Sequence, residues 1–239
     1  MTRLSVNINK VALIRNSREG NLPNLYQIAK DCEYFGAEGI TVHPRPDERH
    51  VRYADIPMLR AITMSEFNIE GNPIPKFMDL VLANKPDQCT LVPDSPDALT
   101  SDRGWDTIKH ADFLTDITAE LHKAGIRVSI FVNANAKMVE GAKAVGADRI
   151  EFYTGDFARI FVHNPKLAIE PHRKAAKVAN DIGIGINAGH DLNLDNISFY
   201  RKHIENLLEV SIGHALISDA LYYGLDNTIQ MYLRALQRD

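Results

Sequence analysis

Histidine and glutamate residues stand at or just past the ends of several short apolar runs in this chain. The residues concerned are His43, His50, Glu70, Glu151, His190 and His214. Imidazole and carboxyl groups exchange protons near neutral pH when their surroundings tune them. One such histidine alone is more often structural than catalytic, but an active site explains so many together better. We therefore predict an acid–base set made of His43, Glu70 and His190.

Cationic and glycine-containing segments near the same positions indicate a phosphate ligand. Arg45 and Arg18 are candidate anion clamps, because a guanidinium group binds phosphate through two hydrogen bonds. The segments Ala188-Gly189-His190 and Ile212-Gly213-His214 place glycine where backbone N–H groups can approach a phosphate at the start of a helix. Turn geometry alone would equally account for these glycines. A small phosphorylated substrate fits the whole set best.

The elements that must position these side chains are short runs rich in apolar and β-branched residues. We predict strands at Leu4–Ile8, Gly39–His43, Phe67–Glu70, Gln88–Val92, Arg127–Val132, Arg149–Tyr153, Ile184–Asn187 and Leu208–Ile212. Most of these runs are nearly continuous in apolar character, which is typical of parallel strands covered on both faces. The carboxyl ends of such strands meet on one face, so the acid–base residues are expected to share one mouth.

The stretches between the runs have the spacing of amphipathic helices. The predicted apolar stripes are Leu25, Ile28, Cys32 and Phe35; Leu114, Ile117, Leu121 and Ala124; and, within Ser218–Arg238, Leu221, Leu225, Ile229, Tyr232 and Leu236. Glycine stands between a helical stretch and the next strand at positions 36, 125, 146 and 183. Glycine is expected there because helices commonly end on a residue in the left-handed conformation.

This order of strand, helix, glycine and strand predicts an α/β fold, a single (β/α)8 TIM barrel with short extra helices over residues 1–239. An open, doubly wound sheet is the alternative. It is disfavoured because no GxGxxG motif follows the first run and no shift in composition marks a second domain.

Composition limits the partners. The chain carries 27 lysine and arginine residues against 31 aspartate and glutamate residues, a net charge of −4. We therefore expect no nucleic acid partner, and phosphate recognition must be local. No uncharged apolar run approaches the ~20 residues of a membrane helix, and the first residues lack the apolar core of a signal peptide. A cytoplasmic location without membrane contact is expected.

The remaining polar residues suggest no other mechanism strongly. Cys32 and Cys89 are far apart in the chain, so neither a disulfide scaffold nor a structural zinc site is expected. The other five histidines are expected on solvated faces or in outer loops: His110, His122, His163, His172 and His203. A GxSxG motif is missing, and Lys10 is the only lysine near a strand end that could form a Schiff base.

Two alternatives to acid–base catalysis on a phosphorylated substrate stay open at this point. His43, Glu70, Glu151 and His190 could ligate a divalent metal, as in metal-dependent sugar-phosphate aldolases and epimerases, although no HExxH or carboxylate-dense motif supports this. The barrel could also bind a phosphorylated metabolite without catalysis.

In order along the chain, these residues resemble the pyridoxine 5′-phosphate synthase family over nearly the whole length. The segments that carry the resemblance are Val6–Asn9, Leu13–Arg18, Gly39–Arg45, Asp47–His50, Asn68–Glu70, Leu91–Pro93 with Thr100, Ile150–Glu151, Asn187–His190 and Ile212–His214. The family condenses 1-deoxy-D-xylulose 5-phosphate with 3-amino-2-oxopropyl phosphate to pyridoxine 5′-phosphate, inorganic phosphate and water.

The resemblance implies a role for each site residue. His43 and Glu70 would be general bases, His190 the proton donor, and Glu151 a stabiliser of developing charge. The sugar phosphate would be held by Arg45, His50 and Thr100, and the amino-ketone phosphate by Asn7, Arg18, Gly213 and His214. The substrate amine supplies the imine nitrogen, so the resemblance implies no metal or redox cofactor, and it implies a homo-octamer.

Three segments depart from the family pattern. Asn9-Lys10 stands where Asp-His is common, and Lys10 cannot shuttle protons as a histidine would. Asp191 replaces the usual glycine, adding a carboxylate near a phosphate, although its backbone N–H is kept. Arg103-Gly104 replaces Gly-Gly. None of these removes a proposed acid or base, so we expect activity to be retained.

Overall fold

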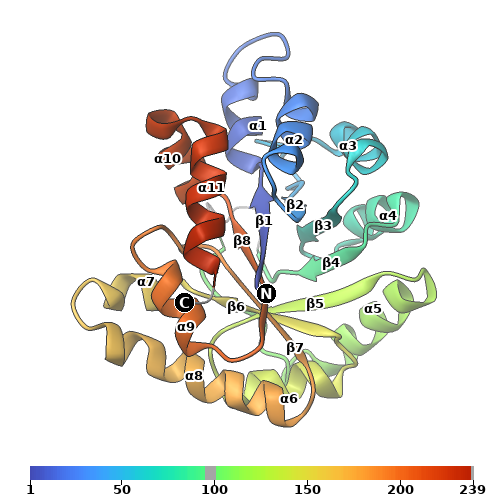
Figure 1. Ribbon diagram of the computed structural model, residues 1–239. Coiled ribbons are helices and arrows are strands. Elements are labelled where there is room, and N and C mark those ends of the chain that lie inside the picture. Colours follow the sequence, from blue (N-terminus) through green and yellow to red (C-terminus); the bar gives the residue numbers. More distant parts are fainter. Residues whose placement is uncertain (95–100, 238–239) are drawn as a thin grey trace.

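The computed structural model describes residues 1–94 and 101–237, and its strands form a closed parallel barrel (Figure 1). The strands pair in sequence order, and the last pairs with the first. They are β1 (Arg3–Asn7), β2 (Gly39–Val42), β3 (Glu66–Gly71), β4 (Gln88–Leu91), β5 (Arg127–Val132), β6 (Arg149–Tyr153), β7 (Gly185–Gly189) and β8 (Leu207–Ile212). The predicted TIM barrel is confirmed.

Helices surround the strands on the outside (Figure 1). They are α1 (Asn9–Asn16), α2 (Leu25–Tyr34), the 3₁₀ turn η1 (Tyr53–Asp55), α3 (Ile56–Ile62), α4 (Pro75–Asn84), α5 (Ala111–Lys123), α6 (Ala136–Ala144), α7 (Gly155–Phe161), α8 (Pro165–Asp181), α9 (Ile197–His203), α10 (His214–Tyr223) and α11 (Leu225–Leu236). Among the described residues, α1, α7 and α9 are short, as are α3 and η1.

Each predicted strand is present, with ends that differ by at most two residues. The glycines at the helix-to-strand turns adopt positive φ as expected: 101° at Gly36, 78° at Gly125, 89° at Gly146 and 67° at Gly183. These conformations are open to glycine without steric cost, which is why the residue marks each turn.

The predicted stripe over Ser218–Arg238 is wrong in its first half. Gly224, with φ 76° and ψ 154°, ends α10, and α11 starts in a new direction. The side chain of Leu221 is consequently 75% exposed, whereas Ile229, Tyr232 and Leu236 on α11 are buried. The apolar residues keep one helical spacing across Gly224, so the spacing alone does not show that the segment forms two helices.

His172 is also misplaced by the sequence reading, because it lies in the core rather than on a solvated face. It is 2% exposed, and its Nδ1 lies 2.9 Å from the Tyr200 hydroxyl, which joins α8 to α9. Phe157 contacts both rings edge-on. Burial lowers the pKa of His172 to about 4, so this imidazole is neutral at pH 7.

Alternate residues of each strand face opposite sides, which divides the strands into two environments. On β1, Leu4 and Val6 belong to the apolar core beneath the helices. Ser5, between them, lies 2.7 Å from the Thr41 hydroxyl of β2, and both side chains are buried. In the same way Thr90 of β4 donates to Asn68 of β3 at 3.1 Å. The barrel interior below the mouth is therefore polar.

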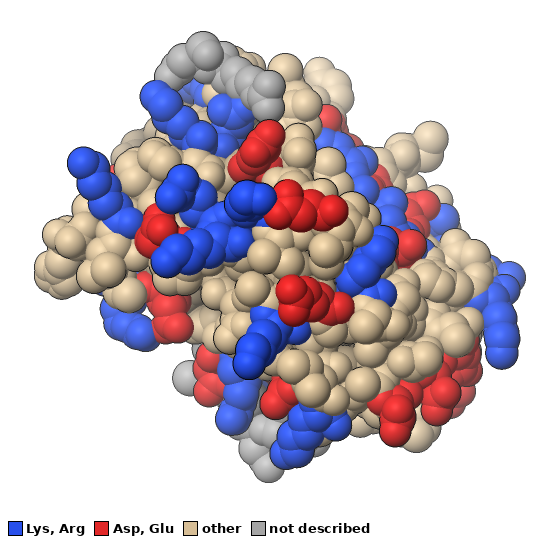
Figure 2. All heavy atoms as spheres, turned by 90° about the horizontal axis from the view of Figure 1, so that it is seen from below, with Lys and Arg blue, Asp and Glu red and all other residues tan. Residues whose placement is uncertain are grey.

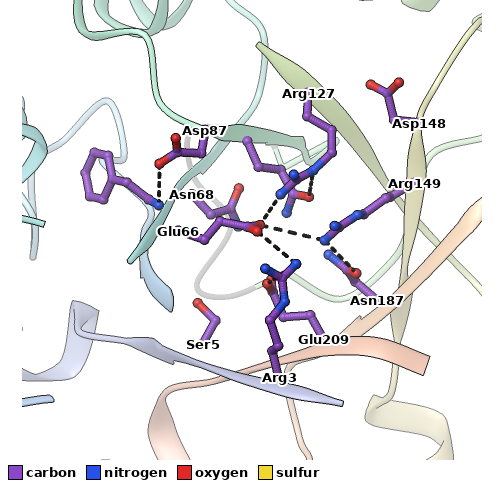
Figure 3. A network of polar contacts seen from close by, with 12 residues as sticks. Arg3, Ser5, Glu66, Asn68, Asp87, Arg127, Asp148, Arg149, Asn187 and Glu209 are labelled. Atoms are coloured by element: carbon purple, nitrogen blue, oxygen red, sulfur yellow. Dashed lines mark hydrogen bonds and ion pairs between the residues drawn. The ribbon is translucent and has the colours of Figure 1, made fainter. Parts of the chain in front are cut away.

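The end of the barrel opposite the mouth is closed by ion pairs between strand starts (Figure 3). Glu66, the first residue of β3, lies 2.9 Å from Arg3 of β1 and 3.7 Å from Arg149 of β6, and it also binds Arg127 of β5. Glu209 of β8 lies 3.8 Å from Arg3. This floor cluster (Arg3, Glu66, Arg127, Arg149, Glu209) ties five strands together at one end.

The outer surface shows charges of both signs. Figure 2 shows lysine and arginine interspersed with aspartate and glutamate over one face, without a continuous basic area in the described part of that view. None of the helices within residues 1–94 and 101–237 has both the length and the apolar character needed to cross a membrane.

Candidate active site

A cavity of about 500 Å³ opens at the carboxyl ends of the strands. It is lined by Asn7, Asn9, Lys10, Leu13, His43, Arg45, Arg49, His50, Glu70, Val92, Ser101, Phe131, Glu151, His190, Asp191, Ser211, Gly213 and His214. Among the described residues, every predicted site residue except Arg18 is in this set. Parallel strands in a closed ring bring these side chains together although they are far apart in the sequence.

His43 follows β2 directly and lies against the barrel wall. Its backbone N–H donates to Oδ1 of Asn9 at 2.9 Å, and its ring contacts the His50 ring edge-on at 6.3 Å between centroids. The side chain is buried, and burial together with the charge of Arg45 lowers its pKa well below the usual value. The imidazole is therefore neutral at pH 7 and can accept a proton.

His50 is fixed in one tautomer by the backbone. Its Nδ1 accepts the N–H of Val51 at 3.0 Å, so in the neutral ring the proton is on Nε2. Burial and the neighbouring Arg45 lower the pKa of His50 to about 4. The ring is thus a neutral N–H donor toward the cavity, suited to an oxygen of a bound phosphate.

Glu70 and Glu151 place two buried carboxyl groups in the same cavity. Burial, with the charges of Asp94 and Glu209, raises the pKa of Glu70 to about 8. Burial and the nearby Glu70 raise the pKa of Glu151 well above its usual value. Both carboxyl groups therefore favour their protonated forms at pH 7.

Glycine on β7 makes room for one of these carboxyl groups. A Cβ at position 189 would lie 2.2 Å from Oε1 of Glu151. Glu70 is contacted instead by the Asn7 amide, whose Nδ2 donates to Oε2 at 3.4 Å. The positions of both carboxyl groups thus depend on a small or an amide residue on another strand, Gly189 of β7 for Glu151 and Asn7 of β1 for Glu70.

His190 lies at the rim in an unusual backbone conformation. Its φ is 94°, rare for a residue with a side chain, and its Nδ1 lies 2.7 Å from Oδ2 of Asp191. Its ring contacts the Tyr153 ring edge-on at 5.3 Å. The hydrogen bond with His190 is the largest of the influences that hold the pKa of Asp191 below its usual value. Asp191, which replaces the glycine common in the family, therefore orients the proposed proton donor.

Arg45 is buried and already paired within the chain. Its Nη2 lies 2.5 Å from Oδ2 of Asp94, which also accepts the hydroxyl of Ser101 at 2.7 Å. The Asp94 carbonyl in turn accepts the Asn72 amide at 2.8 Å. A guanidinium held this way keeps a fixed direction, which suits a clamp for a phosphate.

The turn from β8 into α10 brings backbone donors to the cavity. No side chain caps α10 at Gly213 within the described residues, so the N–H groups of its first turn are open to an anion. Gly213 passes so close to β1 that a Cβ there would lie 3.1 Å from the Asn7 Cβ. Asn7, Gly213 and His214 thereby line the same part of the cavity.

The structure leaves two predicted binding residues unassigned to the cavity, for different reasons. Arg18 is exposed on the segment after α1 and is not among the lining residues. Thr100 lies outside the described residues. Arg103, the third departure from the family pattern, is 76% exposed beside Asp102, while the N–H of Gly104 donates to Asn133 at 2.7 Å.

Sequence reasoning missed several lining residues. Ser211 could have been found, because it precedes Gly213 by two and therefore faces the barrel interior like Glu209. Phe131 is the last residue but one of β5, the one strand to which no site residue was assigned, and its ring lies 5.7 Å from that of Tyr153 between centroids. Asp94 carries no local signal, since its role depends on Arg45, 49 residues away in the sequence.

Comparison with known proteins bears on this cavity. The family model described as "Pyridoxal phosphate biosynthesis protein PdxJ" matches residues 4–238. The chain belongs to the PdxJ family. Among curated PdxJ relatives, the pyridoxine 5′-phosphate synthase of Cytophaga hutchinsonii is 60% identical over 238 residues, covering 100% of both chains. That of Flavobacterium johnsoniae is 58% identical over 237 residues, covering 99% of this chain and 100% of its own.

Solved structures with little sequence similarity share the architecture. A 3-keto-L-gulonate-6-phosphate decarboxylase from Vibrio cholerae superposes with a TM-score of 0.66 at 8% identity, covering 98% of this chain and 97% of that one. This likeness shows the fold alone. The predicted pyridoxine 5′-phosphate synthase activity is confirmed by the PdxJ family and its relatives, and the metal-dependent aldolase or epimerase is not favoured.

Proposed function

We propose that the cavity binds 1-deoxy-D-xylulose 5-phosphate and 3-amino-2-oxopropyl phosphate together. It condenses them to pyridoxine 5′-phosphate, inorganic phosphate and water. The observation that supports this best is one cavity in which a neutral imidazole and two protonated carboxyl groups adjoin two sets of phosphate-binding groups. Imine formation and ring closure are proton transfers and eliminations, and they need donors and acceptors of this kind.

His43 and Glu70 are the proposed general bases. His43 is neutral and ready to accept a proton. Glu70 is protonated at pH 7, because its pKa is about 8. A substrate ammonium group close to Glu70 would favour the carboxylate and thereby release this proton. Binding of the amino-ketone would thus convert Glu70 into the base that the reaction needs.

His190 and Glu151 have the remaining proposed roles. His190, oriented by Asp191, donates a proton to a leaving oxygen at the rim. Glu151 is buried deeper, and its carboxyl group stabilises charge that develops on the intermediates. The amine of the substrate supplies the ring nitrogen, so the proposed reaction uses no metal, redox cofactor or enzyme lysine.

The two phosphates are assigned to different sides of the cavity. Arg45 and His50, with Thr100, would hold the sugar phosphate, and Asn9, Lys10 and Asp191 would add contacts to the substrates. The start of α10 at Gly213 and His214, with Asn7 and Arg18, would hold the amino-ketone phosphate. The helix N-terminus and the guanidinium group each supply directed N–H donors, which compensates for the negative net charge of the chain.

A homo-octamer in the cytoplasm is proposed by resemblance to the family. An apolar surface supports contact between copies: Leu13 and Ile14 of α1 are 42% and 46% exposed, and Leu221 and Tyr222 of the adjoining α10 are 75% and 86% exposed. The two helices lie side by side (Figure 1). Exposed apolar groups gathered in this way are typical of protein interfaces. Arg18, close to α1 in sequence, would then serve its own mouth or that of a neighbouring subunit.

The test is the reaction itself. Purified protein is incubated with both substrates, and pyridoxine 5′-phosphate and inorganic phosphate are quantified, with and without EDTA. We expect both products in equal amounts and a rate that EDTA leaves unchanged. Absence of product would refute the proposed function, and loss of activity in EDTA that added metal restores would favour the metal-dependent alternative.

A further inference from the structure

The short helix α1 holds the segment from His43 to His50 at both of its ends. At the start of the helix, Asn9 accepts the backbone N–H of His43 at 2.9 Å. At its last residue, the Nδ2 atom of Asn16 lies within hydrogen-bond distance of three successive carbonyl oxygens, those of residues 48, 49 and 50, at 3.4, 3.1 and 2.7 Å. The second contact is thus to the backbone that carries His50.

Arg15 reinforces this contact from inside the protein. It is 3% exposed and forms a two-pronged ion pair with Asp55, with both N···O distances at 2.8 Å. Its Nη2 also donates to the carbonyl of His50 at 3.2 Å. Asp55 accepts the backbone N–H of Arg52 at 2.8 Å, which fixes the far side of the loop. Separating the buried Arg15 guanidinium from Asp55 would leave an unpaired buried charge, which is costly. The ion pair therefore holds this part of the loop rigidly.

The loop from His43 to His50 contains a residue in an unfavourable backbone conformation. Glu48 has φ 52°, in the left-handed region, which non-glycine residues seldom occupy. The His50 ring takes its direction from the adjoining backbone, through the N–H of Val51. The orientation of this imidazole in the cavity therefore depends on where the backbone at residues 48–50 is held.

We propose that Arg15 and Asn16 are positioning residues for His50. Neither side chain lines the cavity as the described residues form it. They act by fixing the loop carbonyls, which sets the backbone from which the imidazole points toward the sugar phosphate. The inference rests on the proposed function, because it takes His50 as a ligand of that phosphate.

Steady-state kinetics of Asn16→Ala test this role. We expect the KM for 1-deoxy-D-xylulose 5-phosphate to rise about tenfold, the size of effect expected for a misplaced hydrogen bond to a charged group. The KM for the amino-ketone phosphate and kcat should stay within about twofold, because the acids and bases are not displaced. Arg15→Lys, which keeps the cation beside Asp55 but loses the planar fork, should give a smaller rise in the same KM.

Asn164→Ala is the matched control. The Asn164 side chain accepts the N–H group of Leu167 at the start of α8, a helix that follows β6 rather than β2. The variant should lower Tm as Asn16→Ala does, with both KM values unchanged. If Asn164→Ala raises the same KM, the effect reflects general destabilisation and the inference is wrong.

A double-mutant cycle separates positioning from structure. In a His50→Ala background, Asn16→Ala should raise the KM for the sugar phosphate by less than about twofold, since the group it positions is gone. The same tenfold rise in that background, or no rise in the wild-type background, would overturn the proposal. If Asn16→Ala does not fold, the cycle is run with Arg15→Lys. Failure of the proposed function is distinguishable, because the wild-type protein would then make no product.

Discussion

Burial shifts the pKa values of imidazole and carboxyl groups in opposite directions within one cavity. His43 and His50 lose their protons, while Glu70 and Glu151 keep theirs. Each group is neutral at pH 7, which is the less costly state for a buried group. The site therefore holds protons on carboxyl groups beside neutral bases, and in the proposed mechanism the charge of the substrate decides when these protons move.

The proposed bases make a prediction about turnover. Glu70→Gln and His43→Gln keep the size and polarity of the side chains but cannot accept the proton at issue. We expect kcat to fall by about 100- to 10,000-fold, the usual contribution of general acid–base catalysis. The KM values, measured by initial rates for each substrate, should change only a few-fold. A change confined to KM would contradict the assigned roles.

Gly189→Ala tests the placement of Glu151. The added Cβ would lie 2.2 Å from Oε1 of Glu151, so the carboxyl group must move. Because that atom is the end of a flexible side chain, the fold should accommodate it at a cost of about 1–3 kcal/mol. Circular dichroism should show a native spectrum, while kcat falls by at least about tenfold. Unchanged kcat in the folded variant would show that the position of Glu151 is unimportant.

At the scale of residues, the sequence predicts which side chains lie at the site better than it predicts what surrounds each side chain. His43, Glu70 and His190 could be identified because each stands at a strand end, which local spacing reveals. The burial of His172 could not, since it depends on Phe157 and Tyr200 packing from other helices. The Arg45–Asp94 pair was out of reach for the same reason.

At the scale of elements, the first residues of the strands stabilise the barrel, and the residues at the strand ends form the proposed active site. The floor cluster joins β1, β3, β5, β6 and β8 at one end (Figure 3), and the acid–base groups occupy the other. This separation is the usual division in such barrels, with stability at one face and chemistry at the other.

Glu66→Gln tests this division. The substitution leaves Arg3, Arg127 and Arg149 without their shared carboxylate, and Glu66 is almost fully buried. We expect the free energy of unfolding to fall by about 1–3 kcal/mol, less than for a fully buried ion pair, because the side chains of Arg3 and Arg127 are 33% and 29% exposed. Urea denaturation measures it, and Glu209→Gln provides a comparison with a more distant partner. At temperatures where the variant is folded, KM and kcat should match those of the wild type. A large loss of kcat would contradict the division.

The elements themselves were largely predictable. Continuous apolar runs and the glycines after helices located every strand, because a parallel barrel repeats the same local rule. The break at Gly224 was not found, since α10 and α11 continue one apolar spacing across it. Two successive helices without a strand between them, such as α10 and α11, are thus the hardest elements to predict from the sequence.

At the scale of the whole molecule, buried neutral histidines make stability depend on acidity. The pKa of His172 falls from 6.5 to about 4 on folding, so the unfolded chain binds more protons between these values. The contribution of His172 is therefore complete above pH 6.5 and is lost as the pH falls toward 4. For His172 alone this amounts to about 3 kcal/mol. His50, whose pKa is also about 4, acts in the same direction.

His172→Gln checks this pH dependence. Glutamine retains a hydrogen-bond acceptor for Tyr200 but does not titrate. Urea unfolding between pH 4 and 7 should show a shallower loss of stability in the variant than in the wild type. Equal slopes would mean that His172 does not carry this dependence. Because His172 is far from the cavity lining, kcat at pH 7.5 should be unchanged.

The negative net charge of the molecule gave no hint of a phosphate ligand, because the groups that would bind phosphate are concentrated at one mouth. The most direct test of this arrangement is a crystal structure of the protein with 1-deoxy-D-xylulose 5-phosphate and inorganic phosphate bound. We predict one phosphate group beside Arg45 and His50, a second at the start of α10 beside Gly213 and His214, and the carbon chain of the sugar within reach of His43 and Glu70. Both phosphates on the same side, or a sugar bound away from Glu70, would contradict the account.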